Sequence, residues 1–221
     1  MTRRNLSNGR HDALSEERIV EASIGILDRD GVNGLTFRAL ASRLKTGSGA
    51  IYWHVADKQT LLAAATDHVI AGVMAAVPTQ SVPQDTIRVV ALGVFDAIEA
   101  HPWIGAQLSS NPWQRASLRI LERIGGAVQA IGVPEHALFN AVTALINCIF
   151  GVASQHAAAS RLPRDIDRSD HLAAIAAAWA QLDPVEYAFV RELAAQLPGH
   201  DDRTQFLAGI NLVLVGVESI R

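Results

Sequence analysis

The spacing of apolar residues constrains this chain more than any other feature of its sequence. Ala and Leu recur at three- and four-residue intervals throughout, while alternating runs rich in β-branched residues are nearly absent. Recurrence at these intervals is typical of amphipathic helices and not of strands. We therefore predict an all-α protein.

Capping residues place four helices in the first 77 residues. Ser15 is a good N-cap for the first helix, Thr36 for the second and Asp57 for the fourth. We expect Gly31 to end the first helix. A turn around Lys45–Gly47 should then lead into a very short third helix.

Proline and glycine divide the rest of the chain. Residues 77–85 contain Pro78 and Pro83, and they predict a boundary between a small head and a larger body. Seven further helices are expected, over residues 84–100, 103–110, 113–131, 135–158, 169–181, 185–197 and 202–220. A chain of 221 residues is long enough to bury a core in both parts.

Composition excludes several classes of protein. Hydrophobic residues make up 49% of the chain and charged residues 19%, which argues against disorder. No apolar run reaches membrane-span length, and the N-terminus lacks the apolar stretch of a signal peptide. The single cysteine, Cys148, excludes an internal disulfide and fits a reducing compartment. We expect a cytoplasmic protein with no membrane partner.

Charge is distributed unevenly. Residues 1–58 hold nine Lys/Arg and seven Asp/Glu, a balance of +2, whereas residues 59–221 hold ten and fifteen, a balance of −5. A mildly basic head on an acidic body is compatible with a protein that touches nucleic acid through its head alone.

The segment KTGSGAIYWHVADK, residues 45–58, is the most informative motif. It lacks the third glycine of a dinucleotide-binding loop and the Gly-Lys-Ser/Thr ending of a P-loop, so we discard both nucleotide interpretations. A helix-turn-helix remains, in which Ser48 opens the second helix and Ile51 and Val55 anchor it in the core. The local chemistry leaves two roles open for the aromatic cluster formed by Tyr52, Trp53 and His54: core packing or contact with DNA.

The wider context of this motif resembles a known family. The run GVNGLTFRALASRLKTGSGAIYWHVADKQTLL, residues 31–62, is similar to the head of the tetracycline-repressor (TetR) family of transcriptional regulators, and the likeness spans residues 15–76. SSNPWQRASLRILERI, NCIFGVASQ and FLAGINLVLVGVESI have weaker counterparts in that family's body. The resemblance implies a three-helix, helix-turn-helix head on a helical body that binds a ligand and dimerises.

The resemblance also implies a DNA-binding set. Arg38 matches an arginine that reads a base, and we predict two hydrogen bonds from it to a guanine. Ser48, Gly49 and Ala50 match the front of the recognition helix. Tyr52, Trp53, His54 and Lys58 match contact positions, mostly to the DNA backbone, and Thr36 matches a helix cap facing phosphate.

The turn departs from the family pattern. Lys45 and Thr46 stand where the family carries glycine and a small apolar residue, so we expect Gly47 to take over the backbone role of the missing glycine. The front of the recognition helix is also chemically sparse, since Ser48 alone offers a hydrogen-bonding side chain.

The body is expected to form a homodimer and a ligand cavity. Two apolar helices, residues 136–157 and 204–220, are candidates for a four-helix interface across the dyad. The predicted cavity set is Phe95, Trp103, Gln107, Leu108, Ser110, Asn111, Trp113, Phe139, Asn147, Phe150, Gln155 and Trp179.

Amides occupy the positions that would hold a metal-bound drug. Gln107, Asn147 and Gln155 stand where the resemblance places the histidines and glutamate around a magnesium–tetracycline chelate. Amides replace these groups poorly around a hard cation. We therefore expect no metal site and no metal-dependent tetracycline binding, and predict a small, largely apolar and neutral effector instead.

We divide the chain into a flexible basic arm (1–14), a helix-turn-helix domain (15–60), a connecting helix (61–77) and a ligand-binding and dimerisation domain (78–221). Two alternatives remain open: an all-helical enzyme, and a helical module that binds DNA or protein without a ligand. No catalytic constellation or cofactor motif favours the enzyme. Asp165, Asp167, Asp170 and His171 could suggest a metal cluster, but they lie in a charged loop where we expect them to be solvated.

Overall fold

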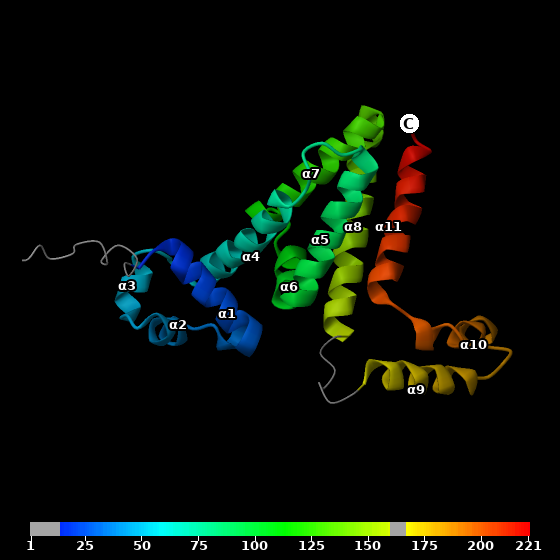
Figure 1. The fold of residues 1–221 in the computed structure, drawn as a ribbon, viewed down its shortest axis with the longest axis horizontal. Coiled ribbons are helices and arrows are strands. Elements are labelled where there is room, and N and C mark those ends of the chain that lie inside the picture. The colour runs from blue at the N-terminus through cyan, green and yellow to red at the C-terminus, as the bar shows by residue number, and fades with distance from the viewer. Residues whose placement is uncertain (1–13, 160–166) are drawn as a thin grey trace, which may run out of the picture.

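A computed structural model describes residues 14–159 and 167–221, and within these ranges the chain is helical with no strand (Figure 1). The all-α prediction is confirmed. The elements are α1 (Glu16–Gly34), α2 (Phe37–Leu44), α3 (Ser48–Tyr52), α4 (Lys58–Ala75), α5 (Pro83–Ala100), α6 (Trp103–Ser110), α7 (Arg115–Ile131), α8 (Glu135–Ala159), α9 (Arg168–Ala180), α10 (Ala188–Ala194), a 3₁₀ turn (Leu197–Gly199) and α11 (Asp202–Glu218).

Side-chain caps fix the starts of the long head helices. The hydroxyl of Ser15 accepts a hydrogen bond from the amide of Arg18 at 3.3 Å. The carboxylate of Asp57 accepts one from the amide of Thr60 at 2.7 Å. These bonds satisfy amides that lack a partner in the first helical turn, and the hydrogen bonds from Thr60 hold the pKa of Asp57 below its usual value. Both predicted helix starts are confirmed.

The first helix ends differently from the expectation. Gly31 adopts φ 67°, ψ −174°, which interrupts the regular backbone, but the chain makes a further helical turn that reaches Gly34. Gly31 is therefore a kink and not the end of α1. The left-handed φ explains why glycine stands there, since only glycine adopts it freely.

The head has a small apolar core of its own. Ile19, Ile26, Leu40, Ile51 and Leu61 are all buried, and they come from α1 to α4. Ile51 is the single fully buried residue of α3, and Val55 beside it is also buried. The predicted anchoring of the short helix is confirmed.

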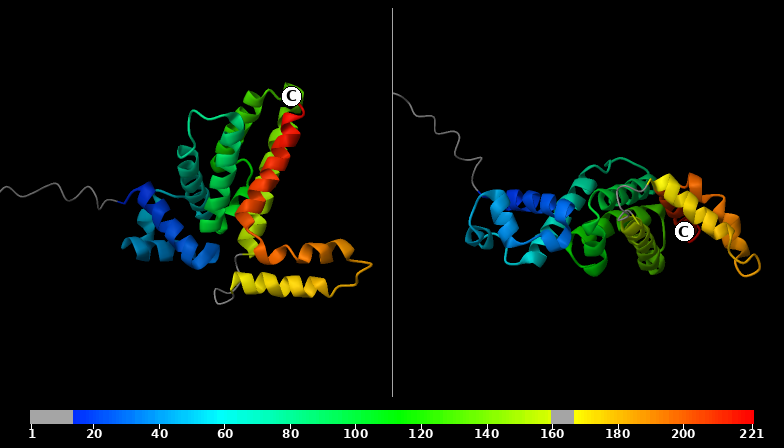
Figure 2. Two further views of the ribbon diagram at one scale, coloured as in Figure 1. Left: turned by 45° about the vertical axis from the view of Figure 1, so that its right-hand side comes forward. Right: turned by 90° about the horizontal axis from the view of Figure 1, so that it is seen from below.

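Helix α4 runs from the head into the body. Its N-terminal part packs with α1, and it also contacts α5, α6 and α7 (Figures 1 and 2). In the body, α5 packs against α4, α7, α8 and α11, and its residues Val90, Val94 and Phe95 are buried. The body core therefore surrounds α5.

Head and body are also joined through α1 and α6. Asp28 on α1 accepts a hydrogen bond from Nδ1 of His101 at 2.7 Å and another from Nε1 of Trp103 at 2.8 Å. Trp103 opens α6 and is buried. One carboxylate thus connects the head to the start of a body helix.

The segment between α8 and α11 projects from the body as a hairpin of α9 and α10 (Figures 1 and 2). No residue of α9 is buried, and Ala194 is the single buried residue of α10. The helix expected over 185–197 is shorter, because Asp183 accepts from the amides of Val185 and Glu186 and shapes a turn before α10.

Candidate nucleic-acid interface

The bend between α2 and α3 is made by Lys45. This residue adopts φ 53°, ψ 44°, and its amide donates to the carbonyls of Ala41 and Ser42 at the end of α2. Gly47 has an ordinary extended backbone at φ −84°, ψ 146°. The expectation that Gly47 replaces the missing family glycine is wrong. Lys45 takes the left-handed conformation itself, because a residue in that conformation caps the orphan carbonyls of α2.

The front of α3 is open to solvent. Ser48 and Ala50 are half-buried and Gly49 is exposed. A Cβ built on Gly49 would meet no atom within 4 Å. Packing inside the protein therefore does not require glycine at this position, although glycine lowers helix stability relative to alanine.

The aromatic cluster lies on the surface. Trp53 is 90% exposed and Tyr52 is 55% exposed, and His54 is exposed as well. The ring of Tyr52 stacks on Phe37 at 4.2 Å with an interplanar angle of 6°, which fixes its position beside the start of α2. Of the two roles left open by the sequence, core packing is excluded for Trp53.

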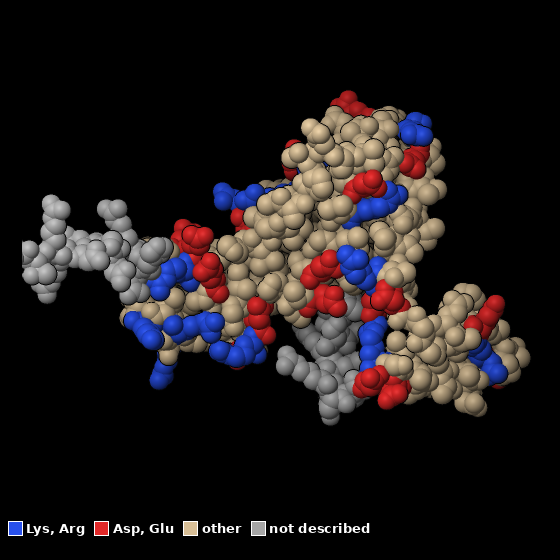
Figure 3. Space-filling view, in the orientation of Figure 1, with Lys and Arg blue, Asp and Glu red and all other residues tan. Residues whose placement is uncertain are grey.

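Positive charge gathers around the same elements. Residues 36–58 contain Arg38, Arg43, Lys45 and Lys58 but a single acidic residue, Asp57. Arg38, Lys45 and Lys58 make no ion pair with any other residue that the structure describes. Figure 3 shows Lys and Arg along the edge of the head formed by α2. A phosphate backbone would meet unpaired cations there.

Thr36 occupies the position predicted for it at the start of α2. Its hydroxyl accepts a hydrogen bond from the amide of Ala39 at 3.1 Å, and the residue is exposed. The first turn of α2 consequently presents its N-terminal end, with Arg38 exposed on it, to the solvent beside α3. Thr36, Arg38, the front of α3, the aromatic cluster and Lys58 thus belong to one end of the molecule.

The residues predicted to line a ligand cavity are spread over different environments. Phe95, Trp103 and Leu108 are buried in the core, with Phe95 stacked on Phe206 at 4.7 Å. Gln107, Phe150 and Trp179 are half-buried. Ser110, Asn111, Trp113, Phe139, Asn147 and Gln155 are exposed. Trp179 lies on the projecting α9, away from the other members of the set.

The cavities of the described part of the chain involve other residues. One of about 500 Å³ lies between α4, α5 and α7, and the side chains of Met74, Ser81, Thr86 and Arg123 contribute to it. A second lies between α1 and α4, and a third between α7 and α8 includes Phe139. Sequence reasoning missed the first cavity, because it forms where α4, α5 and α7 pack together and no local pattern marks it.

Two features bear on the enzyme alternative. No group of three or more His, Cys, Asp or Glu side chains that could hold a metal ion occurs within residues 14–159 and 167–221. Burial raises the pKa of the Cys148 thiol, which disfavours the reactive thiolate. Asp167 and Asp170 lie at the start of α9, where the carboxylate of Asp167 caps the helix. Asp165 and residues 1–13 of the proposed arm fall outside the described residues, whereas Leu14 packs against the core.

Comparison with known proteins gives consistent matches. The family model described as "Bacterial regulatory proteins, tetR family" matches residues 19–65, which run from α1 into α4. A solved structure titled as a transcriptional regulator, a TetR from Streptomyces coelicolor, is 50% identical, covers 94% of this chain and 99% of its own, and superposes with a TM-score of 0.87.

Two further relatives extend the comparison. An HTH-type transcriptional regulator of Saccharopolyspora erythraea is 33% identical over 144 residues, and the match spans 64% of this chain and 60% of that relative. The Streptomyces coelicolor TetR family protein ActR in complex with actinorhodin is 22% identical, with 92% of this chain and 95% of that chain covered and a TM-score of 0.76. The second likeness establishes a shared fold.

Proposed function

The chain belongs to the tetR family of bacterial regulatory proteins and is a transcriptional regulator, and from this premise we propose how it works. It binds a palindromic DNA operator as a homodimer and acts as a repressor. A small-molecule effector releases it from the operator. The observation that carries the proposal is the exposed α3, which presents an open helix front and an aromatic cluster on the basic end of the head.

Base reading falls to Arg38 and to the front of α3. Arg38 is exposed, is the second residue of α2 and has no ion-pair partner among the described residues, so its guanidinium is free to take two acceptors on a guanine. Ser48 supplies one hydroxyl, Ala50 can meet a thymine methyl, and Gly49 allows the helix backbone to approach the groove closely.

The residues around α3 are proposed to contact the DNA backbone. The indole N–H of Trp53, the hydroxyl of Tyr52, the imidazole of His54 and the ammonium of Lys58 are all phosphate donors. The stacking of Tyr52 on Phe37 orders one of these donors before DNA arrives, which lowers the entropy cost of binding. The exposed cap at Thr36 presents a helix N-terminus to phosphate.

The proposed functions correspond to successive segments of the chain. We propose that residues 15–60 form the DNA-binding domain, 61–77 the connecting helix and 78–221 the ligand-binding and dimerisation domain, with residues 1–14 as an arm. The contacts of α4 with both α1 and α7 support a connecting role. As a DNA-binding regulator, the protein is expected to work in the cytoplasm.

The dimer interface is proposed on α8 and α11. These helices pack on one another and leave large apolar side chains uncovered, among them Phe139 and Leu212, each 76% exposed, and Val215. Residues Glu135–Gln155 of α8 are long and apolar enough to cross a membrane by length and composition, so the expectation that no apolar run reaches this length is wrong. Within the chain, α8 packs against α5, α6, α7 and α11, and these contacts leave the apolar side chains named above exposed. We propose that a second copy of the chain covers this face.

An effector is proposed on the analogy of a relative that shares the fold. The printed description of ActR names a complex with actinorhodin, so a protein of this fold holds a small organic molecule. Gln107, Asn147 and Gln155 remain the reason to expect no magnesium-dependent tetracycline binding. Titration with tetracycline in the presence and absence of magnesium checks this, and micromolar affinity with magnesium would contradict it.

Selection of bound DNA from a random library tests the proposed function directly. We expect an inverted repeat whose half-sites lie about one helical turn apart, or about 34 Å. Sedimentation of the protein on that DNA should give two chains per site. Recovery of no preferred sequence, together with turnover in a screen of hydrolase substrates, would instead favour the enzyme alternative.

A further inference from the structure

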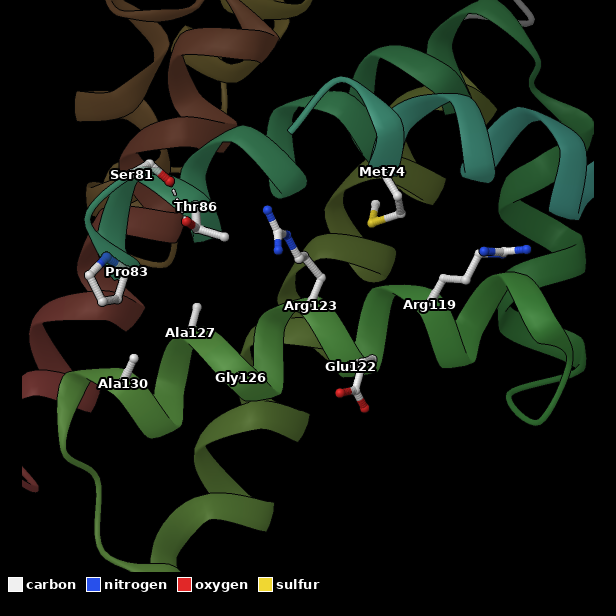
Figure 4. A pocket seen from close by; sticks show the side chains of 10 residues that line it. All are labelled: Met74, Ser81, Pro83, Thr86, Arg119, Glu122, Arg123, Gly126, Ala127 and Ala130. Atoms are coloured by element: carbon white, nitrogen blue, oxygen red, sulfur yellow. Dashed lines mark hydrogen bonds between the residues drawn. The ribbon is translucent and has the colours of Figure 1, made fainter. Parts of the chain in front are cut away.

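The cavity between α4, α5 and α7 has an unusual polar side. It measures about 500 Å³ and is lined by Met74, Ser81, Pro83, Thr86, Arg119, Glu122, Arg123, Gly126, Ala127 and Ala130 (Figure 4). Cavities of this size hold small organic ligands. The apolar members come from all three helices or their connection, so the space has an apolar wall as well as charged groups.

Arg123 is the lining residue of this cavity with an unsatisfied buried donor among the described residues. Its side chain rises from α7 toward the space between Thr86 and Met74 (Figure 4). One guanidinium nitrogen, Nη2, donates to the carbonyl oxygen of Pro78 at 3.0 Å. The Nε atom is buried and has no hydrogen-bond partner in the part of the chain that the structure describes. A buried donor without an acceptor is costly, and a ligand that supplies the acceptor removes that cost.

The other charged groups do not neutralise Arg123. Arg119, one turn earlier on α7, already pairs with Asp67 at 2.7 Å. Glu122 lines the cavity but extends to the opposite side of α7 from Arg123 (Figure 4). Arg123 makes no ion pair with any residue in the ranges 14–159 and 167–221. The cavity therefore contains a cation that has no ion-pair partner among the described residues.

The hydroxyl groups nearby are occupied. The Oγ of Ser81 and the Oγ1 of Thr86 lie 2.6 Å apart and bond to one another. Thr86 Oγ1 also donates to the carbonyl of Val82 at 3.4 Å, so the pair can offer a ligand lone pairs but no free donor, whereas Met74, Pro83, Ala127 and Ala130 offer apolar surface. This combination fits a molecule with an apolar body and one acidic end.

We infer that this cavity takes an effector with an apolar body and a single carboxylate or similar oxyanion, anchored by Arg123. The inference rests on the proposed function, in which a small molecule controls DNA binding, and it names the chemical class of that molecule. It differs from the neutral effector expected from the sequence, because the environment of the Arg123 guanidinium became visible with the packing of α4, α5 and α7.

The contact with Pro78 connects this site to the head. Pro78 follows α4, whose other end begins at Lys58 beside the aromatic cluster. An oxyanion competes with the Pro78 carbonyl for the donors of Arg123. Loss of that bond frees the segment that holds the C-terminal end of α4 against α7. Ligand binding and the position of the DNA-contacting end are thereby coupled.

Matched acids and amides test the chemical class. The probes are 1-naphthoate, 4-phenylbutyrate and decanoate, each beside its neutral amide, and binding to the full-length protein is measured by calorimetry. We expect at least one acid to bind roughly tenfold or more tightly than its amide. Equal affinities within every pair, or no binding of any acid at about 5 mM, would overturn the inference.

Two variants test the anchor. Arg123→Gln removes the charge but keeps hydrogen-bonding capacity, and Arg123→Lys keeps the charge. We expect Arg123→Gln to lose roughly tenfold or more in affinity for the acid with little change for the amide, and Arg123→Lys to recover part of the loss. Unchanged acid binding by Arg123→Gln, in a variant whose thermal melting shows that it is folded, would refute the anchoring role.

Operator binding separates this inference from the proposed function. If the wild-type protein selects a palindrome but no acid binds, the chemical class is wrong and the regulator remains. If an acid binds through Arg123 but no DNA is selected, the site stands and the proposed function fails. If both hold, the bound acid should weaken operator binding by the wild type, and the same concentration should leave operator binding by Arg123→Gln unchanged.

Discussion

Replacement of Trp53 by alanine separates DNA contact from folding more cleanly than any other change in the head. The side chain is 90% exposed, so the folded protein gains little from it. A tryptophan offers up to about 250 Å² of surface, of which the buried tenth is about 25 Å², worth about 0.6 kcal/mol. In a chain of this size that loss lowers the melting temperature by about 1–2 °C.

The expected loss of DNA affinity is much larger. A hydrogen bond from the indole to a phosphate is worth about 1.5 kcal/mol or more, because the acceptor is charged. A symmetric dimer loses this contact in both heads, so the operator affinity of Trp53→Ala should fall about a hundredfold at fixed salt. Fluorescence anisotropy with the selected operator measures the affinity, and calorimetry measures the melting temperature.

Trp113 provides a matched control. It is also a tryptophan and is 80% exposed, but it lies in the body between α6 and α7. Trp113→Ala should leave operator affinity within about twofold of the wild type. If Trp53→Ala binds the operator as tightly as Trp113→Ala does, or if its melting temperature falls by many degrees, then Trp53 is not a DNA contact and the reasoning from its exposure is refuted.

Four further predictions follow from the head and the interface. Arg38→Ala should relax the preference at one position of each half-site at a cost of about 1–3 kcal/mol per contact, whereas Lys58→Ala should weaken binding to every sequence and reduce the salt slope by about two, one phosphate contact in each head; selection and salt titration distinguish the two. Lys45→Gly should be more stable to heat than Lys45→Ala by about 1 kcal/mol, because both remove the charge and glycine alone relieves the left-handed strain; equal melting would contradict this. Gly49→Ala should leave stability unchanged or raise it by up to about 1 kcal/mol while it lowers operator affinity, so unchanged affinity by anisotropy would argue against close approach of the helix to DNA. Leu212→Glu should shift the protein from dimer to monomer in sedimentation and abolish binding to the full palindrome, and a variant that stays dimeric would place the interface elsewhere.

Local rules predicted the head well. Ser15, Thr36 and Asp57 cap helices as expected, because a cap depends on residues within one helical turn. Burial of Ile51 beside exposed Trp53 was also within reach, since a single turn of helix has one face toward the core. Such features need no knowledge of distant contacts.

The sequence did not predict which residue of the turn is left-handed, nor where the cavity lies, and the two reasons differ. At Lys45 the strain of a left-handed residue is about 1 kcal/mol, a difference that the local sequence does not decide between two neighbouring positions. The cavity depends on how three helices far apart in sequence pack. Periodicity placed Arg123 on a helix but gave no information about the carbonyl of Pro78 or the Ser81–Thr86 pair beside it. The predicted cavity residues Trp103 and Phe95 are large and apolar, and packing used them for the core instead.

Because α4 is one continuous helix, a small tilt at its body end displaces its other end by a larger distance. With 18 residues the helix is about 27 Å long, so a tilt of about 5° at its body end displaces the other end by about 2 Å. Hydrogen bonds to phosphate tolerate much less than that, and in a two-fold dimer the distance between the two α3 helices changes by the sum of both displacements. If the proposed effector site moves one end of α4, this helix transmits the motion to the proposed DNA-contacting end, and a local rearrangement then decides whether both half-sites can be bound at once.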